Sequence, residues 1–176
     1  MAEASDQLQA LVAAAREGDN VAVRELVRRT QPAIWRLCNV LGSPGEEDDL
    51  VQDTYLRAFR SLETYRGEAP ITAWLLSIAR RVCADHVRGR MRQRRIVDAL
   101  VDSPDDRWIP APGNPTWELL DGIDPDRREA FVLTQVVGLS YDEAANVLDC
   151  PIGTIRSRVA RARDDLMHEV SAAEAG

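Results

Sequence analysis

Arginine is the residue type whose placement in this chain points to chemistry, because all 22 of the basic side chains are arginines and none is lysine. Two stretches concentrate them. Residues 78–95 hold seven arginines and one acid, and residues 152–163 hold four arginines and no acid. A guanidinium binds phosphate and the edge of guanine through paired hydrogen bonds. The sequence therefore predicts two basic surfaces suited to nucleic acid.

The formal net charge of −7 does not contradict this prediction. The acidic residues gather elsewhere, in residues 46–53 and 98–126. Salt screens a charge beyond about 10 Å, so phosphate contacts depend on the local field and not on the total charge. The charge pattern indicates basic surfaces separated by acidic ones.

The second basic stretch lies in a predicted helix-turn-helix. Ser140 and Glu143 form a capping box that starts one helix, and Pro151 suits the first position of the next. In that second helix an apolar stripe predicts a buried side, made of Ile155, Val159, Ala162 and Leu166. The opposite side is the candidate DNA-reading face, made of Thr154, Arg156, Ser157, Ala160, Arg161 and Arg163. The alternative is a solvated arginine face on an ordinary bundle helix.

The helix that follows Pro44 carries an acidic side. Its apolar stripe consists of Val51, Tyr55, Ala58, Phe59 and Leu62. Beside that stripe lies a second face, made of Asp48, Asp49, Gln52, Asp53 and Leu56. Composition alone leaves two readings open, a solvated acidic patch and a docking surface for a basic partner. A calcium site is not favoured, because no loop glycine or flanking ligand pattern accompanies the carboxylates.

The first basic stretch continues a helix whose core stripe is predicted to be Ile71, Trp74, Leu75, Ile78 and Val82. Another face of this helix is polar and basic, with Ser77, Arg80, Arg81, Ala84 and Arg88. Asp85 lies within this face, and the helical spacing also allows it to do no more than pair with Arg81 or Arg88.

Helical periodicity predicts an all-α fold, since no segment alternates with a period of two over a strand's length. Helices are expected over residues 6–17, 20–41, 44–62, 70–92, 117–122, 126–137, 141–148 and 152–170. A stretch rich in proline and aspartate interrupts them and reads as a linker. The predicted organisation is a helical bundle at 1–96, a linker at 97–115 and a helix-turn-helix bundle at 116–176.

Several classes of protein are not favoured by the sequence. No run approaches the roughly 18 apolar residues of a membrane helix, and the start of the chain lacks the features of a secretory signal, which favours a cytoplasmic protein without membrane insertion. Cys38, Cys83 and Cys150 are widely spaced and are expected to be reduced thiols. With two histidines in the chain, no metal site, cofactor site or catalytic set is predicted.

Taken together, these residues resemble the extracytoplasmic-function (ECF) sigma factors of bacterial RNA polymerase, with an actinobacterial character. The likeness rests on Asp49-Leu-Val-Gln-Asp-Thr-Tyr-Leu-Arg-Ala-Phe-Arg60, on Trp74-Leu-Leu-Ser-Ile-Ala-Arg-Arg81 with Asp85-His-Val-Arg88, and on Gly153-Thr-Ile-Arg-Ser-Arg-Val-Ala-Arg-Ala-Arg163. It covers nearly the whole chain. It implies a promoter-specificity subunit without catalysis, whose partners are core polymerase, through the clamp helices and the flap, and promoter DNA. The resemblance also allows an anti-sigma protein as a further partner, and the sequence does not identify it.

The resemblance also implies roles for residues. The surface that docks on the clamp helices corresponds to Asp48, Asp49, Leu50, Gln52, Asp53 and Leu56. The element that opens DNA and captures a flipped base corresponds to the loop 63–70, which includes Arg66, and to Arg80, Arg81, Asp85 and Arg88. Many family members have Asn where this chain has Arg81, which leaves the captured base undefined. The candidate DNA-reading face corresponds to the reader of the distal promoter element.

Two other functions compete with this reading. One is a conventional helix-turn-helix regulator with an N-terminal helical interaction domain. The other is a helical adaptor whose basic faces bind acidic proteins. The regulator would need a ligand pocket or a phosphoacceptor domain, and no strand-helix alternation or dimerisation helix is visible in the sequence. A salt-dependent shift of DNA in the presence of polymerase would argue against the adaptor.

Overall fold

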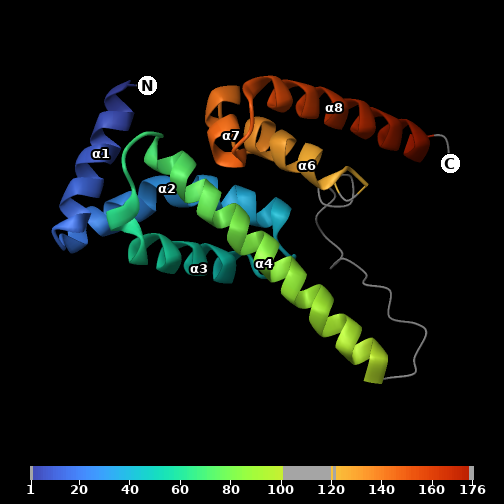
Figure 1. Cartoon of the computed structure of the whole chain (residues 1–176), viewed down its shortest axis with the longest axis horizontal. Coiled ribbons are helices and arrows are strands. Elements are labelled where there is room, and N and C mark those ends of the chain that lie inside the picture. Colours follow the sequence, from blue (N-terminus) through green and yellow to red (C-terminus); the bar gives the residue numbers. More distant parts are fainter. Residues whose placement is uncertain (1, 101–119, 121, 175–176) are drawn as a thin grey trace.

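The computed structural model describes residues 2–100, 120 and 122–174, and throughout these residues the regular structure is helical. The N-terminal unit contains α1 (Ala2–Arg16), α2 (Asn20–Leu41), α3 (Glu47–Arg60), the short 3-10 turn η1 (Leu62–Thr64) and α4 (Ile71–Leu100). The C-terminal unit contains α6 (Pro125–Phe131), the π-helical turn η2 (Val132–Val136), α7 (Tyr141–Leu148) and α8 (Ile152–Glu174). Figure 1 shows α6, α7 and α8 lying over α2 and the first half of α4, while the second half of α4 extends beyond the other helices.

The helix ends follow from local capping. Asp19 precedes α2 and its carboxylate accepts hydrogen bonds from the Val21 and Ala22 amides, at 2.7 and 3.2 Å. Asp124 caps α6 in the same way. The predicted capping box of α7 is confirmed, since the Ser140 hydroxyl accepts from the Glu143 amide and the Glu143 carboxylate accepts from the Ser140 amide. These caps satisfy backbone amides that a helix leaves without partners.

The N-terminal core lies between α2, α3 and α4. Leu26, Ile34 and Leu37 of α2 meet Leu75 and Leu76 of α4, and each of these side chains is at most 2% exposed. Burying a side chain of this size stabilises the fold by about 1.5–3 kcal/mol. The predicted stripes are confirmed at most positions, whereas Phe59, Trp74 and Ile78 are only partly buried.

The C-terminal core is built by α6 and α8 with α7 across them. Leu133, Ile155 and Val159 are buried completely or nearly so, and the small side chains of Ala130 and Ala162 are fully buried between α6 and α8. Alanine at these positions lets the helices approach closely. The predicted stripe of the second helix of the helix-turn-helix is thus confirmed, with Leu166 partly buried at its end.

The two units pack against each other, which the sequence did not predict. The contacts run between α4 and α7 and between α2 and η2. Arg80 of α4 forms an ion pair with Glu129 of α6, with 3.1 Å between Nη1 and Oε2. Arg36 of α2 also donates a long hydrogen bond of 3.5 Å to the Val137 carbonyl. The hydrophobic core therefore continues from one unit into the other.

Two sequence predictions concern the region where the described residues are interrupted. The expected linker begins at residue 97, but α4 continues to Leu100, so its first four residues are helical. The rest of the linker and most of the expected helix 117–122 lie outside the described residues. Among the helices that are described, none has the length and apolar character needed to cross a membrane.

Candidate nucleic-acid interface

The α8 face is the exposed side of the second helix of the helix-turn-helix, defined by Thr154, Arg156, Ser157, Ala160, Arg161 and Arg163. All of these residues are exposed except Thr154, which is half-buried. The Ser157 hydroxyl donates to the Thr154 carbonyl at 2.9 Å, which keeps this side chain close to the helix. The face combines guanidinium groups with small residues, as a helix that enters a DNA groove requires.

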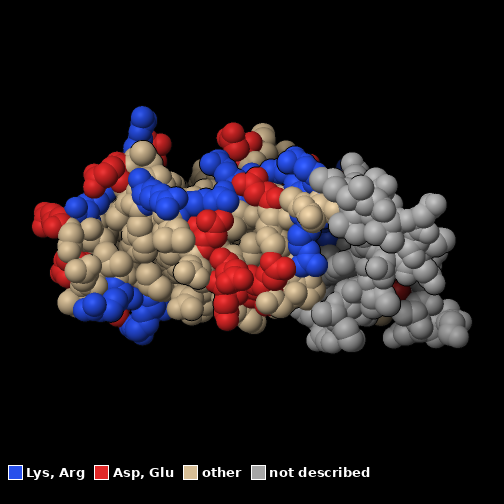
Figure 2. Space-filling view, turned by 90° about the horizontal axis from the view of Figure 1, so that it is seen from below, with Lys and Arg blue, Asp and Glu red and all other residues tan. Residues whose placement is uncertain are grey.

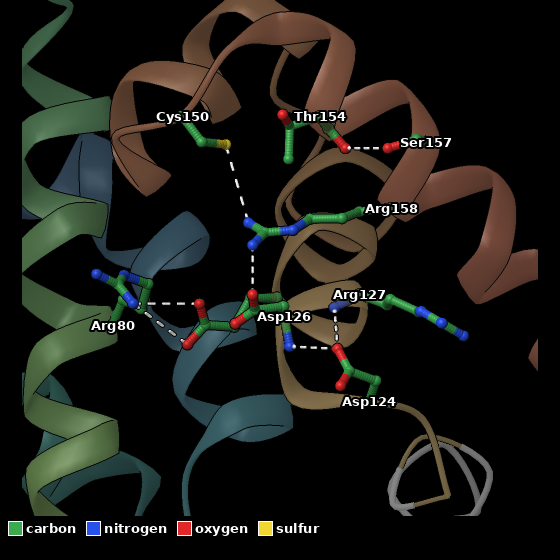
Figure 3. A network of polar contacts seen from close by, with 9 residues as sticks. Arg80, Asp124, Asp126, Arg127, Cys150, Thr154, Ser157 and Arg158 are labelled. Atoms are coloured by element: carbon green, nitrogen blue, oxygen red, sulfur yellow. Dashed lines mark hydrogen bonds and ion pairs between the residues drawn. The ribbon is translucent and has the colours of Figure 1, made fainter.

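The arginines of α8 differ in what they contact. Arg158 turns away from the α8 face, pairs with Asp126 of α6 and approaches the Cys150 sulfur at 3.9 Å (Figure 3). Arg163 donates to the Gln135 side-chain oxygen at 2.8 Å. Within the described part of the chain, Arg156 and Arg161 make no hydrogen bond or ion pair. Arg156 and Arg161 therefore keep all of their donors for a ligand.

A pocket of about 220 Å³ lies at the start of α4. The loop 63–70, called the pocket loop, supplies part of its wall through Thr64, Tyr65 and Arg66. The α4 wall includes Trp74 and Ser77. The opposite wall comes from α7, through Asn146 and Val147. The pocket is smaller than the roughly 300–1,000 Å³ of typical ligand sites, so it suits one flat group better than an extended ligand.

Further along α4, only part of the predicted polar and basic face of this helix is free to bind a ligand. Arg81 and Arg88 are exposed. Arg80 is held by Glu129 and its side chain is 27% exposed, so in this arrangement of the units its guanidinium is engaged by an acid, and its contact with DNA stays a prediction. Burial raises the pKa of Glu129, and Arg80 offsets only part of this effect. The carboxylate was desolvated when the two units packed together.

Asp85 serves as an ion-pair partner, the simpler of the two roles that the sequence allowed. Its carboxylate accepts from Arg57 at 2.9 Å and from Arg88 at 2.6 Å, and no pairing with Arg81 is formed. The Arg57 and Arg88 guanidinium groups lower the pKa of Asp85. Asp85 thus links α3 to α4 and orients Arg88, and its own carboxylate is already engaged.

The α3 face is the acidic side of α3, defined by Asp48, Asp49, Gln52, Asp53 and Leu56. Figure 2 shows acidic side chains gathered in the middle of the molecular face that contains the start of α3. Leu56 is 50% exposed and offers an apolar contact point beside the carboxylates. Asp53 is partly neutralised by Arg57 at 2.8 Å. Asp48 and Asp49 have no ion-pair partner among the described residues.

Leu50 is a correction to the predicted docking surface. It is 3% exposed and packs in the core beside Gly42, where an added Cβ would lie 2.3 Å from the Leu50 Cδ1. Because α3 contacts both α2 and α4, its buried side is wider than the predicted stripe and includes Leu50 as well as Val51. Leu50 supports the α3 face from inside and does not form part of it.

The cysteines are free thiols. Cys38 and Cys83 are fully buried and in contact, with 3.8 Å between their sulfur atoms, and Cys150 is half-buried. The hydrogen bond to Cys38, together with burial, raises the pKa of Cys83. In the described residues no group of three metal-binding side chains comes together.

Contacts made by α1 and α6 were missed by the sequence analysis. Arg16 and Gln9 of α1 bind the pocket loop, and Glu129 of α6 binds Arg80. Apolar periodicity could not have found them, because all three are polar residues that act on partners between 46 and 56 positions away. Arg16, the last residue of its helix, offered no signal beyond its charge.

Comparison with known proteins gives matches over almost the full chain. The family model for sigma-70 region 2 matches residues 26–93, and that for sigma-70 region 4 matches residues 115–166. The ECF RNA polymerase sigma factor SigC of Mycobacterium tuberculosis is 40% identical over 173 residues, covering 94% of each chain. The ECF RNA polymerase sigma-E factor of Escherichia coli K12 is 30% identical over 184 residues, covering 94% of this chain and 96% of that protein.

Solved structures agree with these matches. CnrH, solved in complex with the cytosolic domain of CnrY, superposes with a TM-score of 0.75 at 31% identity, covering 96% of this chain and 98% of that one. The sigma factor RpoE of Bartonella quintana, solved with the anti-sigma factor NepR, gives a TM-score of 0.70 at 28% identity, covering 85% of this chain and 96% of that one.

Proposed function

Because this chain belongs to the ECF RNA polymerase sigma factors, we propose that its two basic surfaces recognise two separate promoter elements while the α3 face holds the polymerase. The protein is a promoter-specificity subunit that directs transcription initiation, and it is not an enzyme. The observation that carries the division of labour is the presence of free arginines on both units, Arg156 and Arg161 on α8 and Arg81 on α4.

The α8 face is the proposed reader of the distal element. Its helix follows a short turn after α7, and its buried side is fixed by α6, so the helix is presented as a rigid unit. Arg156 and Arg161 are placed for bidentate contacts to base edges or phosphates. Ala160 between them allows close approach to the groove. Arg163, tethered to Gln135, is assigned a supporting phosphate contact.

The pocket and the adjoining part of α4 are the proposed site for the proximal element. An unpaired base has a flat apolar surface with polar edges, and the pocket offers the Trp74 ring together with hydroxyl and charged groups. Arg81 and Arg88 extend the positive charge along α4 for the neighbouring phosphates. Arg80 can join them only where a phosphate replaces Glu129 as the partner of its guanidinium.

The α3 face is the proposed polymerase contact. Exposed Asp48 and Asp49 with Gln52 surround Leu56, so a basic partner with an apolar contact point fits this surface. We propose the clamp helices of the polymerase as that partner, and the flap as the partner of the C-terminal unit. We propose two recognition units, an N-terminal one that ends with α4 at Leu100 and a C-terminal one at 116–176, and the cytoplasm as the site of action.

A negative regulator is a further proposed partner. Both neighbouring structures described above hold their sigma factor with a second protein, and one of these is named an anti-sigma factor. An anti-sigma protein for this chain would have to compete for the same surfaces or keep the two units together.

The assignment of the polymerase contact is tested with Asp49→Arg. Purified variants are mixed with sigma-free core polymerase and the complex is measured by gel filtration and by run-off transcription. Reversal of an exposed acid on the α3 face is expected to weaken the complex at least tenfold, whereas the matched control Glu17→Arg, an exposed acid outside this face, leaves it unchanged. Equal binding by both variants would remove the α3 face from the proposal.

A further inference from the structure

The pocket loop is held in place by α1, a helix that lies outside the region 2 match. The Arg16 guanidinium donates to the Leu62 carbonyl from Nε at 3.2 Å and from Nη2 at 2.9 Å, and Nη2 also donates to the Tyr65 carbonyl. Leu62 is the first residue of the η1 turn and Tyr65 follows its last residue, so the two carbonyls flank the turn at the entrance to the pocket loop. The Leu62 carbonyl already accepts the Tyr65 backbone N–H at 3.2 Å, so Arg16 adds a second donor there and supplies a donor to the Tyr65 carbonyl.

Tyr65 links the same helix to the far end of the loop. Its hydroxyl accepts from the Gln9 amide at 2.9 Å and donates to the Ala69 carbonyl at 2.7 Å. Its ring is 5% exposed and lies against Trp74, with 5.4 Å between ring centroids, while the Arg16 guanidinium lies 5.9 Å from the ring centre on another side. Tyr65 thus joins the two ends of the pocket loop and fixes the position of the Trp74 ring.

These contacts bear directly on the shape of the pocket. Tyr65, Ala69 and Trp74 all line it, together with Thr64 and Arg66 from the same loop. Gly67 at the tip of the loop has a φ of +77°, which favours glycine, and the Gln9 amide lies 3.8 Å from where its Cβ would be. Apart from Tyr65, the residues of the loop are exposed or half-buried, so hydrogen bonds from α1 contribute much of what holds its conformation.

We propose that Arg16 and Gln9 are positioning residues for base selection at the proximal promoter element. They act through Tyr65 and the pocket loop and do not touch DNA themselves. The inference rests on the proposed function of the pocket, and it adds that specificity at this element depends on a helix far from it in sequence. Loss of Arg16 removes its hydrogen bonds to the Leu62 and Tyr65 carbonyls, and the loop then samples conformations in which the pocket no longer distinguishes one base from another.

The test measures promoter discrimination and not activity alone. Core polymerase with each variant transcribes a set of templates in which the bases of the proximal element are changed singly, and a second set in which the distal element is changed. Arg16→Ala is expected to reduce discrimination among proximal templates by about tenfold, within the range that a single base contact supplies. Discrimination at the distal element and binding of core polymerase are expected to stay within twofold of the wild type.

Three further variants separate positioning from general damage. Arg24→Ala removes an exposed arginine that makes no ion pair or hydrogen bond within the described chain. It should change neither the proximal nor the distal discrimination. Arg16→Lys, which retains a donor but not the fork, should recover part of the proximal discrimination. Gln9→Ala should give a smaller loss than Arg16→Ala. An equal fall in transcription on all templates, or unchanged proximal discrimination in Arg16→Ala, would overturn the inference. If Arg16→Ala does not fold, the proximal discrimination of Gln9→Ala and Arg16→Lys decides whether the inference holds.

A change in the pocket loop itself distinguishes failure of the inference from failure of the proposed function. The double variant Arg66→Ala, Glu68→Ala alters two exposed loop side chains that line the pocket. If it changes proximal discrimination and Arg16→Ala does not, positioning by α1 is wrong and the pocket assignment stands. If neither changes discrimination, the pocket is not the proximal site and both statements fall.

Discussion

Replacement of two arginines three positions apart on α8 should have opposite consequences. Arg161→Ala removes an exposed guanidinium that has no partner within the described chain. Arg158→Ala removes one whose side chain is 26% exposed and paired with Asp126. A direct base contact contributes about 1–3 kcal/mol to discrimination, which corresponds to a change of about 5- to 150-fold. We expect a loss of that size for Arg161→Ala and less than twofold for Arg158→Ala.

Stability should show the reverse order. The carboxylate of Asp126 is 64% exposed, so the Arg158 pair is worth only about 0–1 kcal/mol. For a chain of this length such a loss lowers the Tm by at most about 4 °C. Arg161→Ala should leave the Tm unchanged, since an exposed side chain without contacts contributes little to the free energy of unfolding.

The assay is run-off transcription by core polymerase with each variant, on one promoter with an intact distal element and on one with that element scrambled. The ratio of the two products reports distal recognition, and parallel thermal denaturation reports stability. Titration with salt adds an independent readout, because loss of one phosphate contact reduces the slope of log K against log salt by about 0.9. If Arg158→Ala lowers the transcription ratio as much as Arg161→Ala does, side-chain exposure does not sort the arginines of α8 and the assignment of its reading face is refuted.

Three other predictions concern the scaffold. Gly42→Ala should destabilise the fold by about 1–3 kcal/mol, because the new Cβ would lie 2.3 Å from the Leu50 Cδ1 and 2.5 Å from the Cys38 carbonyl oxygen. Gly89→Ala, whose new Cβ would have no atom within 4 Å, should stabilise α4 by about 0.5–1 kcal/mol. Urea denaturation that ranks the two variants in the opposite order would contradict the packing. Iodoacetamide should alkylate Cys150 in the native protein and reach Cys38 and Cys83 only after unfolding, because both are buried and the pKa of Cys83 is raised; mass spectrometry that finds Cys83 modified first would show that the core opens. Because burial raises the pKa of Glu129, its contribution to stability is fully present below the ordinary carboxyl pKa of about 4.3 and is lost as the pH rises through the raised value. The free energy of unfolding of the wild type, measured against Glu129→Gln, should therefore fall as the pH rises above about 4.3, and a rise would contradict the assigned direction.

Features that depend on short sequence separations were accessible from the sequence. The bounds of α2 and α7 were predicted as the structure has them, because a capping side chain, a run of helical spacing and a terminating glycine or aspartate are all local. The exposed side of α8 followed from its apolar stripe, since a helix that buries one side must expose the other. The resemblance to sigma factors likewise rested on motifs of about ten residues, and the comparisons confirm it.

Only the tertiary structure decided which of these exposed residues are free to act. Periodicity states that a helix has an apolar side, but it does not state how many neighbours cover the helix. The resemblance placed Leu50 in the docking surface, whereas the packing of α2 and α4 against α3 buries it. Nor does charge alone say that Arg80 is held by Glu129, or that Arg16 closes the pocket loop 46 residues away. Such contacts depend on the relative placement of whole helices, which is set by the packing of both cores at once and leaves no periodic trace in the sequence.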